Sequence, residues 1–252
     1  MRIIAITGAS GGVAQAIINQ LPSEDYVIAL GRDKATLESL YGKRPHTTCW
    51  SLDLSNDAEI AAIVERMYDL HGRIDVFINN AGYGNFNAFD AYTTADIRAM
   101  FEVNTFATMT FSRLVGQRMK AAKRGHIITI ASMAGLMASA KSSVYSATKF
   151  AVIGFSNALR LELADSNVYV TTINPGPIAT SFFDKADPSG EYLKSVGRFV
   201  LQPEDVARRT IAIFGKNKRE VNLPRLMAVA QKAYTLFPKT ADFLARRVFN
   251  YK

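Results

Sequence analysis

Thr7-Gly8-Ala9-Ser10-Gly11-Gly12-Val13-Ala14 follows an apolar run, Ile3–Ile6, that suits a buried strand. A helical pattern, Val13–Leu21, comes next. A glycine-rich turn between a strand and a helix lets backbone N–H groups approach a pyrophosphate at the helix N-terminus. Such a turn can also be purely structural, but strand, turn and helix occur here in the order that binding requires. We therefore expect this stretch to bind a nucleotide.

The alternation of strand and helix patterns continues along the chain. Apolar runs that suit buried parallel strands recur at Ile3–Ile6, Tyr26–Leu30, Thr47–Leu52, Ile74–Ile78, His126–Ala131 and Val168–Ile173. Helical patterns lie at Val13–Leu21, Lys34–Leu40, Ala58–Leu70, Ala95–Ala121 and Tyr145–Ala164. This order predicts an α/β fold: a single-domain, doubly wound parallel sheet (Rossmann fold) with helices on both faces. A ligand is then expected at the carboxyl ends of the strands, near the switch point.

The chain has 252 residues, 48% hydrophobic and 21% charged, which fits one large α/β domain better than two small ones. We expect a Rossmann-type domain over residues 1–223. After Pro175 the pattern breaks into a stretch rich in Pro, Gly and Phe, and such a long connection is usually functional or disordered. We assign a substrate loop to residues 176–200. A further helix is expected after Gln202-Pro203-Glu204-Asp205, where proline and acids suit a first turn.

The formal net charge of +8 is concentrated near the C-terminus. From Gly215 onward nine Lys and Arg stand against two acids, a net charge of +7, so the preceding residues carry about +1. That nearly balanced part shows no basic stripe with interleaved stacking aromatics. The charge pattern therefore argues against a nucleic-acid partner.

Residues 224–252 are expected to form a basic, amphipathic helical extension. Apolar residues at helical spacing mix with cations in Leu226–Phe237 and in Phe243–Phe249, and Pro238 divides the two segments. One interpretation is a pair of helices that lie at an anionic membrane surface. Another, which we favour from the sequence, is packing against the core or against another subunit of a homodimer or homotetramer.

Several features predict a cytoplasmic protein. Met1–Thr7 shows no charged region followed by an apolar one, so no secretory signal is expected. No uninterrupted apolar run is long enough to span a bilayer. The single cysteine, Cys49, cannot form an internal disulfide, which suits a reducing compartment, and we expect it to be a small buried apolar group. Peripheral membrane contact through the extension is the alternative location.

The sequence Tyr145-Ser146-Ala147-Thr148-Lys149 places a phenol and an ammonium four residues apart in a helical pattern. At this spacing the two side chains share one helix face, about 5–6 Å apart at Cβ. An unperturbed tyrosine has a pKa near 10, and about 4 kcal/mol of differential stabilisation would bring it to about 7. A cation about 4 Å away supplies roughly that much at an effective dielectric of about 20. Because the pattern is also common on solvated helix faces, its surroundings decide whether it does chemistry.

The second strand is followed by Gly31-Arg32-Asp33, where a dinucleotide fold meets the adenosine ribose. An acid at this place would accept a hydrogen bond from a free 2′-hydroxyl, whereas Arg32 could clamp a 2′-phosphate. Asp33 could point to the ribose, but directly before Lys34 it better suits the N-cap of the next helix. We therefore favour NADP(H) over NAD(H).

Together these motifs resemble the short-chain dehydrogenase/reductase family from Arg2 to about Thr180, with a weaker likeness beyond. Thr7-Gly8-x-x-x-Gly12-x-Ala14 is similar to its nucleotide turn, and Asn79-Asn80-Ala81-Gly82 to its fourth-strand signature. Asn104, Ser132, Tyr145 and Lys149 are similar to its catalytic tetrad, and Pro175–Thr180 to its nicotinamide-binding segment. The turn departs from the pattern at Ala14, where a glycine is usual. We expect the extra methyl group to push the helix slightly outward and to affect cofactor affinity, although the fingerprint tolerates alanine.

The resemblance implies a role for each matching residue, and no metal. The implied cofactor-binding residues are Gly8, Ser10, Gly12, Val13, Arg32, Asp53, Leu54, Asn80, Ala81, Gly82, Tyr145, Lys149, Pro175, Gly176, Ile178 and Thr180. Asp53 would accept a hydrogen bond from the adenine amino group; its alternative is a helix cap. Asn79 is expected to lock the sheet instead.

The resemblance also implies a mechanism. In reduction the nicotinamide would deliver hydride to a carbonyl carbon, while Tyr145 donates a proton to the oxygen and Ser132 stabilises the developing charge. Lys149 would hold the nicotinamide ribose and lower the pKa of Tyr145. Asn104, inside the predicted helix Ala95–Ala121, would hold a water that connects Lys149 to solvent.

The substrate is expected to be a small-molecule carbonyl or secondary alcohol, mainly apolar around the reacting group. The candidate pocket residues are Met133, Met137, Phe86, Phe89, Phe182, Phe183 and Tyr192, although most of these could equally be core. The alternative function is an NADP(H)-binding redox sensor with little or no turnover. The intact set of Ser132, Tyr145 and Lys149 argues against it, because a sensor has no need of a poised phenol.

Overall fold

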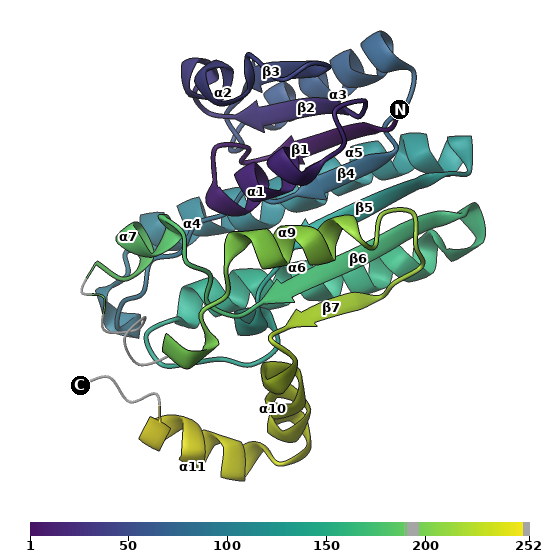
Figure 1. Cartoon of the computed structure of the whole chain (residues 1–252). Helices are drawn as coiled ribbons and strands as arrows, with labels where there is room; N and C mark the ends of the chain where they lie inside the picture. Colours follow the sequence, from purple (N-terminus) through teal and green to yellow (C-terminus); the bar gives the residue numbers. More distant parts are fainter. Residues whose placement is uncertain (189, 191–196, 249–252) are drawn as a thin grey trace.

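The described residues form one sheet of seven parallel strands in the order β3-β2-β1-β4-β5-β6-β7 (Figure 1). The structure is a computed structural model that describes residues 1–188, 190 and 197–248. The strands are β1 (Ile3–Thr7), β2 (Tyr26–Gly31), β3 (Thr47–Ser51), β4 (Val76–Asn79), β5 (Gly125–Ile130), β6 (Val168–Pro175) and β7 (Glu220–Leu223). The chain runs outward from β1 to β3 and then returns to β4 beside β1, so the switch point lies between β1 and β4.

The central strands are apolar on both faces. All five residues of β1 are buried. Ile4 and Ile6 belong to one core cluster, and Ile3 and Ala5 to the other, because alternate residues of a strand point to opposite faces. A strand that is buried on both faces needs helices on both sides of the sheet.

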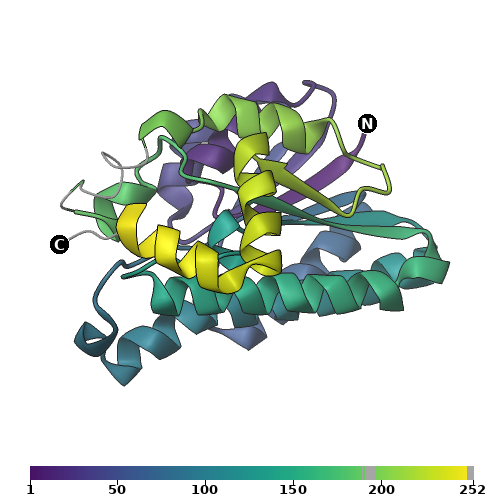
Figure 2. The same cartoon turned by 90° about the horizontal axis from the view of Figure 1, so that it is seen from below.

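Helices cover both faces as this pattern requires (Figures 1 and 2). One layer consists of α1 (Gly12–Gln20), α2 (Lys34–Tyr41) and α9 (Pro203–Ile211), which contribute buried residues such as Ile17 and Val206. The other consists of α3 (Asp57–His71), α5 (Ala107–Ala122) and α6 (Ser143–Glu162). There Phe111 of α5 stacks on Phe77 of β4 with ring centroids 5.1 Å apart. The predicted doubly wound α/β fold is confirmed.

The two edges of the sheet differ from the sequence-based expectation. The six predicted strands are present, but the pattern does not predict β7, whose four residues alternate polar and apolar and are all half-buried. At the other edge, Cys49 of β3 is half-buried rather than fully buried, because an edge strand has a neighbour on one side alone. Burial still raises the pKa of its thiol.

The predicted helix Ala95–Ala121 is interrupted. It consists of α4 (Thr94–Phe101), a π-helical turn, η2 (Glu102–Phe106), and α5. A π turn inserts one residue into the helix and leaves the apolar pattern on either side helical, so periodicity does not reveal it. Asn104 lies in this turn. π turns occur frequently at functional sites, which draws attention to its side chain.

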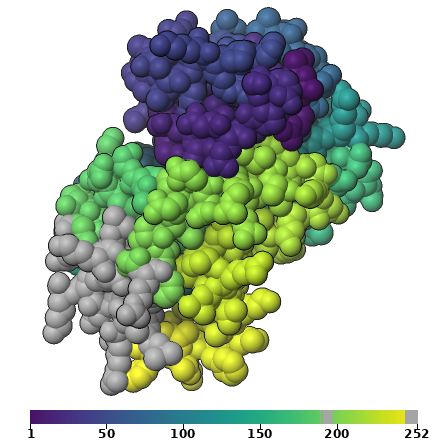
Figure 3. Space-filling view, in the orientation of Figure 1, coloured from purple at the N-terminus to yellow at the C-terminus, as the bar shows by residue number. Residues whose placement is uncertain are grey.

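The remaining elements surround the carboxyl edge of the sheet. They are α7 (Phe182–Ala186), α10 (Arg225–Leu236), α11 (Pro238–Val248) and the short turns η1 (Phe89–Ala91), η3 (Met133–Gly135), η4 (Ala164–Ser166) and η5 (Gly197–Phe199). The predicted substrate loop 176–200 therefore contains a short helix, and Ile178 is bridged to Leu201; residues 189 and 191–196 lie outside the described residues. The hairpin of α10 and α11 projects beyond β7 and forms the lower end of the molecule in Figures 1 and 3.

A buried histidine links strand β5 to strand β6. His126 of β5 is 1% exposed. The Gly215 N–H donates to its Nδ1 (3.1 Å), so we assign the proton to Nε2, which lies 2.8 Å from the Thr171 hydroxyl of β6. The Thr171 hydroxyl in turn donates to the Lys218 carbonyl. Burial lowers the pKa of His126 to about 4, so the ring is neutral at pH 7.

This burial predicts an acid-sensitive fold. Because the pKa falls from 6.5 to about 4 on folding, His126 contributes stability that is complete above pH 6.5 and is lost as the pH falls through 4. The loss amounts to about 3 kcal/mol. We expect the difference in unfolding free energy between the wild type and His126→Asn, measured by urea unfolding across this range, to shrink toward acid pH. His46→Asn, at an exposed histidine, is the matched control. Curves for wild type and His126→Asn that run parallel from pH 7 to 4 would contradict the assignment.

Candidate active site

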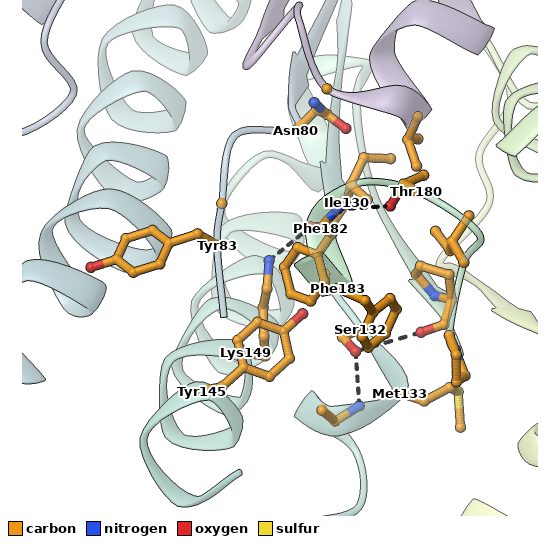
Figure 4. A pocket seen from close by; sticks show the side chains of 18 of the residues that line it. Asn80, Tyr83, Ile130, Ser132, Met133, Tyr145, Lys149, Thr180, Phe182 and Phe183 are labelled. Carbon is orange, nitrogen blue, oxygen red and sulfur yellow. Dashed lines mark hydrogen bonds between the residues drawn. The ribbon is translucent and has the colours of Figure 1, made fainter. Parts of the chain in front are cut away.

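A cavity of about 1500 Å³ lies at the carboxyl ends of the strands. Its lining begins at the glycine turn after β1, passes the ends of β4 and β5, and reaches α7, α10 and α11. All sixteen residues expected to bind the cofactor line this cavity, together with Ser132. Figure 4 shows how part of the lining converges on Tyr145 and Lys149. The topology thus brings together residues that are far apart in the sequence.

The glycine turn needs its glycines for specific reasons. Gly8 has φ +63°, and a Cβ on it would lie 2.7 Å from the Cα of Ala81. A Cβ on Gly12 would lie 2.7 Å from the Cγ2 of Thr180. Ala14, in contrast, is fully buried in the core cluster beneath α1, so its methyl group fills packed space rather than the cavity. The turn therefore leaves a backbone-lined trench between β1 and the segment after β6.

Thr7 and Asn80 fix this turn against β4. The Asn80 side chain donates to the carbonyls of Thr7 (3.0 Å) and Gly8 (3.1 Å). The backbone N–H groups of Asn80 and Ala81 donate to the Thr7 hydroxyl at 3.0 and 3.1 Å. Asn79 points away and donates to Ser112 (2.9 Å), which confirms its structural role. Sequence reasoning assigns no role to Thr7, although it opens the quoted motif.

Charged side chains gather at the β2–β3 end of the cavity. Arg32 and Asp33 follow β2, and Asp53 follows β3. Asp33 caps α2 by accepting from the Ala35 N–H (3.0 Å), as predicted, and its hydrogen bond from Thr36 lowers its pKa. Asp53 is not a helix cap, since Asn56 caps α3.

The Asp53 carboxylate forms a local turn instead. It accepts hydrogen bonds from the N–H and hydroxyl of Ser55 (2.9 and 2.8 Å), which lower its pKa together with the nearby Arg32 charge. Both acids are thus held by local hydrogen bonds, and Arg32 lines the cavity beside them.

Tyr145 and Lys149 meet one turn apart on α6. The Lys149 Nζ donates to the Ile130 carbonyl at the end of β5 (3.1 Å) and lies 5.8 Å from the centroid of the Tyr145 ring. The exposed fractions are 7% for Tyr145 and 5% for Lys149. In Figure 4 the two side chains lie side by side, with Ser132 facing them from the end of β5.

Burial governs the protonation of this pair. It raises the pKa of Tyr145 to about 12, which a hydrogen bond with Ser132 partly opposes, and it lowers the pKa of Lys149 to about 8. Desolvation disfavours the charged form of each group, so it works against the phenolate and the ammonium alike and opposes the lowering of the Tyr145 pKa that we expect from Lys149. At pH 7 the site holds a protonated phenol beside an ammonium.

Ser132 has an extended backbone and lies just beyond the end of β5, directly before η3. Its Oγ accepts from the Ala134 N–H (3.0 Å) and donates to the Pro175 carbonyl (3.5 Å). These contacts connect β5 to the segment Pro175–Thr180 across the cavity. The hydroxyl remains directed toward Tyr145, where it can donate to an oxygen that gains negative charge.

Asn104 lies behind the cavity wall and holds the chain after β4. Its Oδ1 accepts from the Tyr83 N–H (2.9 Å), and its Nδ2 donates to the Tyr83 carbonyl (2.8 Å) and to Thr148 (3.2 Å). A Cβ on Gly82 would lie 3.2 Å from this Oδ1 and 3.4 Å from the Lys149 Nζ. Asn104 therefore positions Gly82 over Lys149. Its side-chain amide is hydrogen-bonded to protein groups. The expectation that Asn104 holds a water stays a prediction.

Aromatic rings enclose the phenol. Phe86 and Phe182 lie 5.6 and 5.7 Å from the Tyr145 ring, and Phe182 packs edge-on against Phe183 at 5.2 Å. The close approach of α7 uses Gly84, where a Cβ would lie 2.8 Å from the Phe182 ring. Met133 and Met137 also line the cavity, as predicted.

Two predicted pocket residues fall elsewhere. Phe89 is 81% exposed and is not among the described residues that line the cavity, so its assignment was wrong. It starts the short turn η1. Tyr192 lies outside the described residues. Residues from α10, namely Met227, Tyr234 and Phe237, line the cavity instead. Their apolar spacing is visible in the sequence, but nothing there places that face over the site.

The cavity fits a dinucleotide. The glycine trench offers backbone N–H groups at the start of α1, and Arg32 supplies a cation at one end. Lys149 supplies a second cation at the other end, beside the small residues Ala81 and Gly82. A cluster of three or more His, Cys, Asp or Glu side chains that could hold a metal is absent from the described residues. Within the same residues, no helix has the length and apolarity needed to cross a bilayer.

Known proteins are similar to this chain in sequence. A family model described as short chain dehydrogenase matches residues 2–190. The 3-ketodihydrosphingosine reductase of Bacteroides thetaiotaomicron is 33% identical over 232 residues, which cover 91% of this chain and 81% of that protein. Retinol dehydrogenase 8 of Bos taurus is 28% identical over an alignment of 288 residues, which covers 98% of this chain and 91% of that protein.

A solved structure gives the same result for the fold. The closed form of a serine dehydrogenase complexed with NADP+ superimposes with a TM-score of 0.80 and is 30% identical. The superposition covers 88% of this chain and 94% of that one.

The Asn104 contacts predict a large stability effect for a side chain that does not line the cavity. Asn104→Ala leaves the N–H and carbonyl of Tyr83 without these partners, so we expect the free energy of unfolding to fall by about 2 kcal/mol or more. Urea unfolding measures the change. Asn217→Ala, at an exposed residue, should change it by less than about 0.5 kcal/mol. An equal effect of the two substitutions would show that the Asn104 bonds give no net stabilisation.

Proposed function

We propose, because the chain belongs to the short-chain dehydrogenase family, that it is an NADP(H)-dependent oxidoreductase that transfers hydride between the nicotinamide and a carbonyl or secondary alcohol. The observation that carries this proposal is the placement of Ser132, Tyr145 and Lys149 at one point of a cavity that fits a dinucleotide. Tyr145 is the general acid in reduction and the general base in oxidation.

The bound nicotinamide supplies the hydride chemistry, and the chain supplies position and protons. At neutral pH the raised pKa of Tyr145 keeps its phenol protonated, which a proton donor to a carbonyl oxygen requires. Ser132 donates a hydrogen bond to the same oxygen and stabilises its developing charge. Lys149, protonated at pH 7, stabilises the tyrosinate that remains after the proton has left. Phe86 and Phe182 exclude water from the transfer.

The preference for NADP(H) rests on Arg32. Its position at the β2 end of the cavity is where the adenosine ribose of a dinucleotide is expected, and a guanidinium can bind a 2′-phosphate through two hydrogen bonds. Asp33, the acid that could favour a free 2′-hydroxyl, is committed to the α2 cap. The serine dehydrogenase structure that contains NADP+ supports the same choice.

The substrate half of the cavity favours an apolar molecule. Beyond Ser132 it is lined by Met133, Met137, Phe183 and the cavity-facing side of α10. Two relatives are named for reduction of ketodihydrosphingosine and for dehydrogenation of retinol, which supports this substrate class. We include a cytoplasmic homo-oligomer in the proposal, since a single free cysteine suits a reducing compartment and α6 exposes Phe150 and Leu161 on one face.

The role of Tyr145 gives the main test. Tyr145→Phe removes the transferable proton and keeps the ring that packs on Phe86, so we expect turnover to fall by roughly 10² or more while NADPH binding stays nearly intact. The measurement is NADPH oxidation with aldehydes, ketones, quinones, steroids and acyl ketones, beside NADPH binding by fluorescence. Tyr169→Phe, at a tyrosine remote from the cavity, should behave as the wild type.

Two results would contradict this assignment. Near-normal turnover in Tyr145→Phe would remove Tyr145 as the proton donor. Tight NADPH binding by the wild type with no oxidation across the whole panel would favour the redox sensor.

The role of Arg32 predicts a change of cofactor preference. Arg32→Ala removes a charge-assisted contact to the 2′-phosphate, so we expect NADPH affinity to fall roughly tenfold to a hundredfold and NADH affinity to change little. Titration of both cofactors measures the two constants. Arg209→Ala, an exposed arginine of α9, is the control. An equal loss of affinity for NADPH and NADH would show that Arg32 does not discriminate between them.

A further inference from the structure

The hairpin of α10 and α11 is held at one edge of the molecule, and its first helix contributes no buried residue. α10 follows β7 directly and contacts that strand and α11 (Figure 1). Over Arg225–Leu236, all of which are described, no residue is buried. This excludes packing of α10 as a core helix, one of the arrangements that the sequence suggests. An amphipathic helix without burial gains little stability from the rest of the protein and needs another surface to cover its apolar side.

One face of α10 belongs to the active-site cavity. Met227, Ala230, Tyr234 and Phe237 line it, at spacings of three, four and three residues that place them on one side of a helix. A Cβ on Gly176 would lie 2.7 Å from the Met227 sulfur. The inner face of α10 is therefore continuous with the segment after β6 that flanks the catalytic end of the cavity.

The opposite face of α10 carries an outer stripe, which consists of Arg225, Val229, Lys232 and Leu236. The spacings of four, three and four residues align these side chains along the helix. Val229 is 65% and Leu236 71% exposed, and both cations are exposed as well. Alternating cations and large apolar residues on one exposed stripe is the pattern of a helix that lies in a lipid interface.

The apolar surface is continuous between the two faces. Leu226 and Phe237 both line the cavity and are 63% and 64% exposed, so they present apolar surface inside and outside it. A molecule that is held at the outer stripe therefore has an apolar route past Leu226 or Phe237 into the cavity.

The net charge around the outer stripe indicates what kind of surface binds to it. Residues 224–252 contain six Lys and Arg and one acid, Asp242, so this part of the chain has a net charge of +5. A symmetric contact with a second copy would place the same cations opposite one another, because a two-fold interface pairs a surface with itself. An anionic surface has the complementary charge, and each Lys or Arg close to it raises partitioning roughly fivefold.

We propose that the outer stripe of α10 docks the protein on an anionic phospholipid surface, so that the cavity mouth at Leu226 and Phe237 opens at the level of the lipid headgroups. Apolar carbonyl compounds that dissolve in the bilayer then reach the cavity without crossing water. The helix lies on the membrane and does not span it.

The test is co-sedimentation of the full chain with vesicles. We expect binding to vesicles of phosphatidylcholine mixed with phosphatidylglycerol, little binding to phosphatidylcholine alone, and weaker binding as salt is raised. Lys232→Glu combined with Leu236→Glu should lower the partition coefficient at least roughly tenfold. Neither residue is among the described residues that line the cavity. The readout is binding, so its failure leaves the hydride-transfer proposal untouched, and the reverse also holds.

A matched control has the same change in charge and apolarity on α3 and α5, away from the hairpin of α10 and α11. Lys120→Glu with Leu70→Glu alters an exposed lysine of α5 and a leucine of α3 that is 60% exposed. This variant should bind vesicles as the wild type does, and far-UV circular dichroism should show that both variants are folded. Equal loss in the two variants, or no preference of the wild type for the anionic vesicles, would overturn the proposal. So would sedimentation velocity in which the stripe variant alone turns a dimer into a monomer, because a second copy then covers the stripe.

Discussion

Burial of an ammonium and a phenol on one face of α6 is the constraint on which the rest of the site depends. Lys149 keeps a protonated amine in a nearly closed site because the Ile130 carbonyl accepts from it. The chain after β4 passes between Lys149 and Asn104 as Gly82, where a Cβ would crowd the Asn104 Oδ1 at 3.2 Å. Asn104 then holds that chain in place through Tyr83, and the π turn η2 is the local geometry that carries Asn104. The sheet, the turn η2 and the helix α6 are thus connected through the contacts around the Lys149 ammonium.

The same burial sets the resting protonation states of Tyr145 and Lys149. Desolvation favours the neutral forms of both groups, so it opposes a tyrosinate more strongly than the partial hydrogen bond from Ser132 assists it. A protonated phenol is ready to give a proton, whereas a base would first have to lose one. The protonated phenol therefore suits the proposed role of Tyr145 as a proton donor, and the cost of forming tyrosinate falls on the step in which it gives up the proton. Lys149 reduces that cost because it lies beside the ring.

The sequence predicts the central part of this arrangement because each element has a local cause. Continuous apolar runs predict six strands, the glycine turn predicts the end of β1, and the spacing of Tyr145 and Lys149 predicts a shared helix face. What it does not predict depends on distant contacts. The π turn leaves the helical periodicity around Asn104 unchanged, and the edge strand β7 is too short and too polar to stand out. The pKa of Tyr145 depends on burial, to which residues distant in sequence such as Phe182 contribute ring contacts. The prediction that Phe89 lines the pocket was wrong for the same reason. An aromatic residue that is close to site residues in the sequence need not face the site in the fold.

The cavity is chemically asymmetric, and the asymmetry follows from which segments form its two ends. Arg32, Asp33 and Asp53 come from loops at one edge of the sheet, where strands end in polar turns. The other edge strand is β7. There the wall of the cavity is completed by α10, which has no buried residue. A wall of this kind can move without disturbing the core, because few packed contacts are lost when it shifts. The rigid end thus suits a constant cofactor, and the loosely held apolar end suits the apolar substrate and the lipid contact that we propose.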